Sequence, residues 1–226
     1  MPTRSILFDI DGTLLTGACD HLTSLADTLN EVPGSRVAFE MRGERPHVEG
    51  VDLAGFIDVQ IVRTLLPDQP AHEVRRIMAQ YADTFTSRIN AGVAAAGTLV
   101  PGAREVLEGL RDRGFSLGIS TGNAHRIARA KLRLHRLDDF FAFSSSLGFG
   151  DVHADRTAAA RAAIVDTDYP AAWCAIVGDT AADMRAARAT GARGIGVLTG
   201  AATADELRTA GAVDIIGSVA DLPTVL

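Results

Sequence analysis

A short apolar run stands at residues 4–9. From residue 103 to the last residue, similar runs alternate with segments in which apolar residues recur at every third or fourth position. Short apolar runs bounded by turn residues indicate buried strands, and apolar residues at every third or fourth position indicate helices. Alternating strands and helices predict an α/β, Rossmann-like, mostly parallel sheet with helices on both faces. The predicted strands are 4–9, 115–120, 140–144, 173–177, 194–198 and 213–216, and the predicted helices are 103–114, 123–134, 156–166, 181–190 and 203–210.

Residues 17–95 interrupt this alternation. Apolar residues recur there at helical spacing in 22–29, 56–65 and 74–85, whereas 32–50 is rich in breakers and charge and predicts turns with a short hairpin. We therefore predict a discontinuous core domain of residues 1–16 and 96–226, with a mainly helical domain of residues 17–95 inserted after the first strand.

Two carboxylates, Asp9 and Asp11, stand where the first predicted strand gives way to a Gly-Thr turn. Alternate side chains of a strand share a face, so the two acids start out side by side. Neighbouring carboxylates repel each other unless a cation or a shared proton lies between them, and Mg²⁺ prefers such oxygen ligands. The plainer interpretation is a strand that ends in a polar turn.

A second acidic pair follows the predicted strand 173–177: Asp179 comes directly after it, and Asp183 lies in the next helix. Ligands of parallel sheets bind outside the carboxyl ends of the strands, so Asp179 could lie beside Asp9 and Asp11. Alternatively, Asp179 only caps the helix and Asp183 is a solvated acid of its first turn.

These segments resemble the motifs of the haloacid dehalogenase-like hydrolases, and most closely their phosphoglycolate phosphatase-like branch. Residues 9–13 are similar to the first motif, Asp-x-Asp-x-Thr, Thr121 to the second, and residues 178–183 to the fourth, Gly-Asp-x-x-x-Asp. The third motif normally offers a lysine. Lys131, the only lysine of the chain, comes too early and within a predicted helix, so Arg156 is expected to supply the positive charge.

The resemblance implies a Mg²⁺-dependent phosphatase that acts on a small phosphate monoester through an aspartyl-phosphate. Asp9 would be the nucleophile and Asp11 the general acid and base. The implied phosphate-binding groups are Thr121, Arg156 and the backbone N–H groups of Gly12 and Gly122. The implied metal ligands are Asp9, Asp11 (through its carbonyl) and Asp179, with Asp183 as metal support.

The inserted domain occupies the position of the family's helical cap. Residues 55–58 are similar to the Gly-x-Thr-Asp stretch of phosphoglycolate phosphatase-like caps, with Ile57 in place of Thr. Arg42, Arg45 and His47 could face the site from the preceding polar segment, although such residues more often lie on a solvated surface. Asn123 is expected to cap the helix that follows it.

Two alternatives remain open. A β-phosphoglucomutase-like sugar-phosphate mutase has both first-motif acids and a histidine near the cap hinge, a place that His21 could fill, although a lone histidine is more often on the surface of a helix. A non-catalytic interaction protein with the same fold would be indicated by loss of a motif acid, yet all four are present. The retained Asp11 argues against a dehalogenase, and the absence of a cap lysine argues against a phosphonate hydrolase.

Composition narrows the partners. The chain has 226 residues and a net charge of −6, which argues against nucleic acid. It has no apolar run of the roughly 18 residues that a membrane span requires, and no secretion-signal pattern. We expect a cytoplasmic protein whose partner is a small phosphorylated metabolite. The identity of the ester and the oligomeric state stay open.

Overall fold

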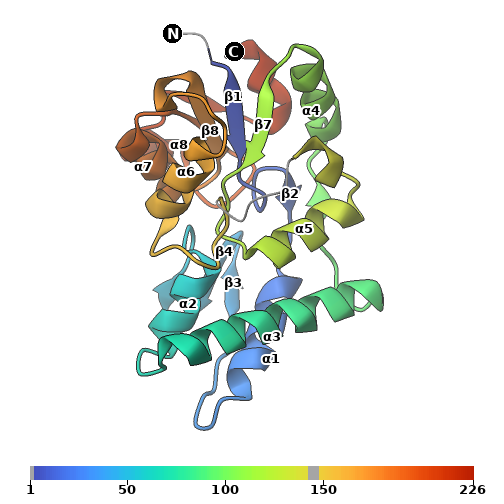
Figure 1. The fold of residues 1–226 in the computed structure, drawn as a ribbon, viewed down its shortest axis with the longest axis vertical. Helices are drawn as coiled ribbons and strands as arrows, with labels where there is room; N and C mark the ends of the chain where they lie inside the picture. The colour runs from blue at the N-terminus through green and yellow to red at the C-terminus, as the bar shows by residue number, and fades with distance from the viewer. Residues whose placement is uncertain (1–2, 142–147) are drawn as a thin grey trace.

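The computed structural model describes residues 3–141 and 148–226. Its central sheet has the strand order β10-β9-β8-β1-β7, and all neighbouring strands of this sheet are parallel. Figure 1 shows β1 and β7 of this sheet side by side. The strands are β1 (Ser5–Phe8), β7 (Ser116–Ile119), β8 (Cys174–Gly178), β9 (Arg193–Val197) and β10 (Asp214–Ile216). The predicted α/β fold is therefore confirmed.

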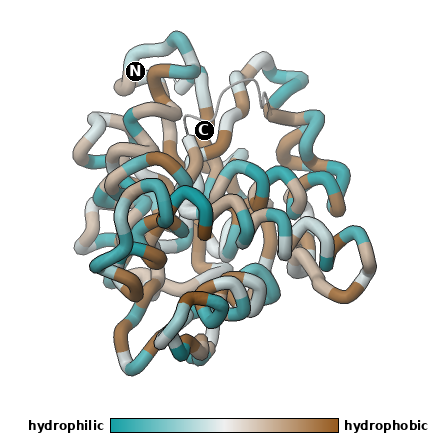
Figure 2. The backbone as a smooth tube through the Cα atoms, turned by 60° about the horizontal axis from the view of Figure 1, so that its bottom comes forward, coloured by the Kyte–Doolittle hydropathy of each residue, from teal (hydrophilic) through white to brown (hydrophobic). Residues whose placement is uncertain are grey.

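Helices cover both faces of this sheet, and the alternation of side chains along β1 shows why. Ile6 and Phe8 belong to the same hydrophobic cluster as Leu107 of α4 and Leu132 of α5. Leu7 points to the opposite face and packs with apolar residues of α6 and α7. The helices of the core are α4 (Ala103–Asp112), α5 (His125–Leu134), α6 (Arg156–Val165), α7 (Ala181–Thr190) and α8 (Ala204–Ala210). In the coiled parts of the backbone, hydrophobic and hydrophilic residues follow one another within each turn (Figure 2).

The strand predicted at 140–144 has a different outcome. Its first residue, Phe140, ends a short 3₁₀ helix, η1 (Asp138–Phe140), and Phe141 is not in a strand. Residues 142–144 lie outside the described residues. There are two further 3₁₀ helices in the described residues: η2 (Ala171–Trp173) precedes β8, and η3 (Val219–Thr224) follows β10.

Residues 17–95, called the inserted segment below, form a separate group of elements beyond the carboxyl ends of β1 and β7 (Figure 1). A ribbon of β2 (Leu15–Thr16) and β6 (Thr98–Leu99) carries the chain into and out of this segment. The segment consists of α1 (Asp20–Asn30), α2 (Asp58–Leu65), α3 (Ala71–Asn90), β3 (Glu40–Arg42), β4 (Arg45–Val48) and β5 (Val51–Asp52). The predicted short hairpin is one part of a three-stranded antiparallel sheet.

The inserted segment has its own hydrophobic core, in which Tyr81 and Phe85 of α3 are fully buried. Ala124 and Ile127, which come from the start of α5, belong to the same cluster. Helix α5 therefore packs against both the sheet and the inserted segment, and links the two cores. Among the described residues, we find no helix with the length and hydrophobicity needed to cross a membrane.

Candidate active site

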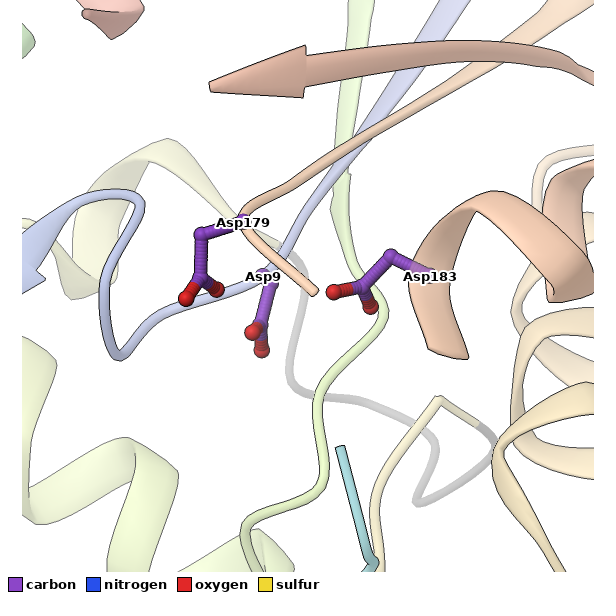
Figure 3. Close-up of side chains that lie close together, drawn as sticks. All are labelled: Asp9, Asp179 and Asp183. Carbon is purple, nitrogen blue, oxygen red and sulfur yellow. The ribbon is translucent and has the colours of Figure 1, made fainter. Parts of the chain in front are cut away.

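Three carboxylates converge at the carboxyl edge of the sheet (Figure 3). Asp9 follows β1, Asp179 follows β8, and Asp183 lies in the first turn of α7. One carboxyl oxygen from each residue lies within 4.8 Å of the others, and all three residues are buried. Because β1 and β8 are adjacent parallel strands, their ends bring acids 170 positions apart in the sequence into one cluster.

Asp183 is held by the start of its own helix. Thr180 is the N-cap of α7, and Asp183 completes a capping box: its Oδ2 accepts from the Thr180 N–H at 3.1 Å and from the Thr180 hydroxyl at 2.6 Å. Its Oδ1 accepts from Arg156 Nε at 2.8 Å. Both carboxyl oxygens are thus bonded to the protein, so Asp183 is better suited to orient its neighbours than to bind an ion directly.

Arg156 is the first residue of α6, and the helix dipole disfavours a positive charge at this end of a helix. Arg156 is nevertheless buried, with 6% of its surface exposed. Its Nη2 lies 2.9 Å from Asp9 Oδ1 and donates to the Ser120 carbonyl at 3.0 Å. Burial raises the pKa of Asp9 to about 6, and the nearby charge of Arg156 limits that rise. The guanidinium therefore lies against the first acid of the motif, where the sequence analysis expected a positive charge.

The acidic cluster fits a hard cation. Asp179 Oδ2 accepts from the Ala201 N–H at 2.7 Å, whereas Asp179 Oδ1 is buried and has no hydrogen-bond partner among the described residues. Burial, followed by the charges of Asp9 and Asp183, raises the pKa of Asp179 well above its usual value. A buried acceptor without a partner and mutually repelling carboxylates are both stabilised when a divalent ion binds through oxygen ligands.

Asp11 has a different set of partners. Its Oδ2 accepts from Lys131 Nζ at 2.6 Å and from Asn123 Nδ2 at 2.8 Å, and His21 Nε2 lies 3.9 Å away. Burial alone would raise the pKa of Asp11, but the positive charge of Lys131, with His21 and these hydrogen bonds, lowers the pKa below its usual value. Asp9 and Asp11 therefore lie in electrostatically distinct surroundings although they are two residues apart.

Lys131 comes too early in the sequence to match the third motif, and yet its side chain lies in this site, beside Asp11. Lys131 is fully buried in α5 and lies on the same side of the helix as Ile127, Ala128 and Leu132. A lysine within the apolar stripe of an amphipathic helix is rarely buried without a partner. That pattern was the available signal for a buried ion pair.

His21 and Asn123 also differ from expectation. His21 is buried rather than on the surface, with its Nδ1 2.6 Å from the Ala18 carbonyl oxygen. Asn123 does not cap α5, because its amide is turned towards Asp11. The N-cap position of α5 is Ala124, and its N–H donates to the Asp58 carboxylate of the inserted segment at 2.8 Å.

The expected phosphate-binding groups are placed unequally. Gly122 lines the cleft beside the acids, and a Cβ atom added to it would lie 3.3 Å from Arg156 Nη1. Thr121, in contrast, is fully buried and does not line the cleft. The Gly12 N–H already donates to the Leu15 carbonyl at 2.6 Å, so it is not available to phosphate in this arrangement. Gly12 has another function: its φ is +76°, and a Cβ there would collide with the Asp179 carboxylate.

A cleft between the core and the inserted segment opens onto these groups and contains about 740 Å³ of space, part of it open to solvent. Arg42, Arg45 and His47 are not among its lining residues. Arg45 instead contacts Asp52 at 2.8 Å and Glu206 at 2.7 Å. From the inserted segment, the lining residues are Ala18, Cys19, His21, Leu22, Met41, Glu44, Pro46, Leu53, Ala54, Gly55, Phe56, Asp58 and Ile61.

Comparison with known proteins defines the class. The family model for haloacid dehalogenase-like hydrolases matches residues 3–191. The chain is 29% identical to a phosphoglycolate phosphatase of Xylella fastidiosa, over 83% of this chain and 77% of that protein. It is 27% identical to a phosphoglycolate phosphatase of Caulobacter vibrioides, over 87% of this chain and 92% of that protein.

Solved structures share the fold. A hydrolase from Pseudomonas syringae superposes with a TM-score of 0.70 at 22% identity, covering 98% of this chain and 96% of its own. A β-phosphoglucomutase from Clostridium difficile superposes with a TM-score of 0.70 at 15% identity, covering 97% of this chain and 93% of its own. The sheet, its acidic edge and the family match together define a hydrolase. The chain belongs to the haloacid dehalogenase-like hydrolases, as its motifs predicted.

Proposed function

We propose that this protein is a Mg²⁺-dependent phosphatase that hydrolyses a small phosphate monoester through an aspartyl-phosphate on Asp9. The observation that carries the proposal is the pairing of two acids that line one cleft with two separate cations, Asp9 with Arg156 and Asp11 with Lys131. The names of the relatives make phosphoglycolate the first ester to test.

The site has ligands for the metal. Asp9 and Asp179 would bind Mg²⁺ through carboxyl oxygens and Asp11 through its backbone carbonyl, while Asp183 would orient the group from its capping box. When bound, the ion would neutralise charge on the phosphoryl oxygens and on the acids. Residues 17–95 would act as a cap that closes the site against water.

In the first step, an Asp9 oxygen attacks phosphorus, a P–O bond to Asp9 forms, and the ester P–O bond breaks. The departing oxygen receives a proton from the Asp11–Lys131 pair, in which Lys131 Nζ donates to Asp11 Oδ2 at 2.6 Å. In the second step, water attacks the same phosphorus and gives a proton back to the pair. The P–O bond to Asp9 breaks, phosphate is released, and the Asp9 carboxylate is regenerated. Arg156 and the Gly122 N–H would hold the phosphoryl oxygens during both steps.

Phosphate release from p-nitrophenyl phosphate, with Mg²⁺ and with a chelator, tests this function. We expect release that requires the metal and that Asp179→Asn reduces strongly, because this substitution removes one charged ligand. Equal release in the chelator would contradict the metal dependence, and absence of release from any phosphate ester would contradict the phosphatase.

A β-phosphoglucomutase-like mutase remains the second candidate, favoured by the position of His21 beside Asp11 and Lys131. A mutase would convert glucose 1-phosphate to its 6-phosphate isomer with little release of free phosphate. A phosphatase would release phosphate at a rate that matches the consumption of the ester. The ratio of these two products therefore separates the two functions.

A further inference from the structure

The lining that the inserted segment contributes to the cleft is mainly apolar. Leu22, Leu53 and Ile61 belong to it and are 5%, 2% and 3% exposed, and Met41 and Phe56 also line the cleft. These residues come from four elements or loops of the inserted segment. The alcohol part of a phosphate ester bound at Asp9 would extend toward this lining, because Asp9, Asp179 and Arg156 come from the core.

Cations are scarce in this cleft. Arg156 is the only arginine among the described lining residues, and it already contacts Asp9 and Asp183. Lys131, the sole lysine of the chain, is fully buried behind Asp11 and does not line the cleft. Arg45, on the same hairpin as part of the lining, is held by two carboxylates and by the Ala201 carbonyl.

An acid, in contrast, is available at the mouth of the cleft. Glu44 is an exposed residue of the turn between β3 and β4, and its Oε2 accepts a long hydrogen bond, 3.4 Å, from the Gly17 N–H. Within the described part of the chain, Glu44 forms no ion pair with an arginine or lysine. A negatively charged group on the substrate would meet this carboxylate without a cation to offset it, and like charges that lie close together disfavour binding.

We propose that the substrates are phosphate monoesters whose alcohol part carries no negative charge: a short apolar chain that ends in a neutral or an ammonium group. This inference rests on the proposed phosphatase function and narrows its substrate class. It predicts a lower kcat/KM for phosphoglycolate, whose alcohol part carries a carboxylate, than for esters of the same size whose alcohol part is neutral or cationic.

Three esters of similar size separate the charge states: phosphoglycolate, ethyl phosphate and phosphoethanolamine. At saturating Mg²⁺, we expect kcat/KM for ethyl phosphate and for phosphoethanolamine to exceed that for phosphoglycolate by about tenfold or more. A kcat/KM for phosphoglycolate equal to or above that for ethyl phosphate would overturn the inference while leaving the phosphatase function intact. Failure of all esters, p-nitrophenyl phosphate included, would overturn the proposed function and this inference together.

Charge reversal at Glu44 tests whether this carboxylate causes the preference among the esters. Glu44→Lys should raise the ratio of kcat/KM for phosphoglycolate to kcat/KM for phosphoethanolamine by about tenfold. Intrinsic reactivity cancels, since the same esters are compared in both proteins. Glu40→Lys is the matched control, because Glu40 is an exposed residue of the same hairpin outside the lining. An unchanged ratio in Glu44→Lys, or an equal change in both variants, would overturn the role of Glu44 in selection.

Discussion

At the residue scale, the site depends on two acids that differ in their partners. Arg156 lies against Asp9, whose pKa is raised to about 6, whereas Lys131 lies against Asp11, whose pKa is lowered. Neighbouring carboxylates with pKa values pushed apart by their surroundings are typical of sites in which one acid has a different task from the other. The pairing with Lys131 thus favours an ionised Asp11, the form required to accept a proton from water.

Removing Lys131 should change the pH dependence of catalysis. In Lys131→Met, the positive charge that lowers the pKa of Asp11 is lost, so that pKa rises and Asp11 becomes ionised only at higher pH. We expect the acidic limb of the kcat profile to move to higher pH, and kcat to fall by about 10²–10³, as for loss of one electrostatic donor. The pH profile of phosphate release measures both.

Arg133→Met is the control for this substitution, since Arg133 lies on the same helix with its side chain 66% exposed. It should leave the profile unchanged. An acidic limb that is the same in Lys131→Met and in the unaltered protein would contradict the coupling between Lys131 and Asp11.

Gly12 allows a second test at this scale. Gly12→Ala would place a methyl group against the Asp179 carboxylate at a φ of +76°, and should raise the Mg²⁺ concentration needed for half-maximal activity. Gly17→Ala is closely matched, because Gly17 has a φ of +67° and nothing lies within 4 Å of its added Cβ. Both variants share the backbone cost of about 1 kcal/mol, so the metal requirement separates them. An equal metal requirement in the two variants would show that the collision with Asp179 has no effect.

At the element scale, most strands and helices follow from local patterns. The acids at the ends of β1 and β8 could be predicted because a strand end is defined by a short apolar run and parallel strands end at one edge. Lys131 and Asn123 could not be placed in the same way. Both reach Asp11 through the path of α5 across the sheet, which depends on packing against residues far away in the sequence.

The start of α5 is a second case in which a contact between residues far apart in the sequence could not be predicted from a local pattern. Its Ala124 N–H is satisfied by Asp58 Oδ2, which comes from the first turn of α2 in the inserted segment and also accepts from the Tyr81 hydroxyl at 3.3 Å. The sequence pattern predicts a cap from the preceding Asn123, because local capping is the common solution. The actual partner is 66 positions away in the chain, so no local signal identifies it.

Burial raises the pKa of Asp58 to about 7, which makes stability depend on pH. An aspartate in the unfolded chain has a pKa near 3.9, so between about pH 4 and pH 7 the folded protein retains a proton that the unfolded chain has lost. Stability contributed by this group therefore falls as pH rises through this range. Asp58→Asn keeps one acceptor oxygen but cannot ionise.

We therefore expect the difference in free energy of unfolding, unaltered protein minus Asp58→Asn, to decrease as pH rises from about 5 to about 6.5, by up to about 1.4 kcal/mol per pH unit. Urea unfolding of both proteins at each pH measures it. The other buried acids are present in both and cancel. A difference that is constant with pH would contradict the raised pKa of Asp58.

At the scale of the whole molecule, the inserted segment is joined to the core at its edges and near the site. The Asp58 N–H donates to the Gly122 carbonyl at 2.8 Å, and the Val59 N–H donates to the Gly150 carbonyl at 3.0 Å. Arg45–Glu206 and Arg126–Asp83 form ion pairs at two outer positions. The segment thus contacts the same loop that carries the expected phosphate-binding Gly122, which links closure of the cleft to the geometry of the site.

Breaking one outer contact should affect substrate binding more than folding. Arg45→Ala removes the partly exposed ion pairs with Asp52 and Glu206, and each pair of this kind contributes about 0.2–1 kcal/mol to stability. We expect a small change in Tm but a several-fold higher KM, because the closed arrangement of the inserted segment is weakened. Arg42→Ala, which removes an exposed pair within β3, should leave both unchanged. A KM that is equal in the two variants would contradict a role of Arg45 in closure.

The central claim is that Asp9 becomes phosphorylated, and acid quenching during turnover followed by peptide mass spectrometry tests it directly. We expect a phosphoryl group on Asp9 in the presence of Mg²⁺ and a phosphate ester, and neither this group nor phosphate release in Asp9→Asn. Phosphate release by Asp9→Asn at the rate of the unaltered protein, with no phosphoryl group on Asp9 in either, would contradict the claim.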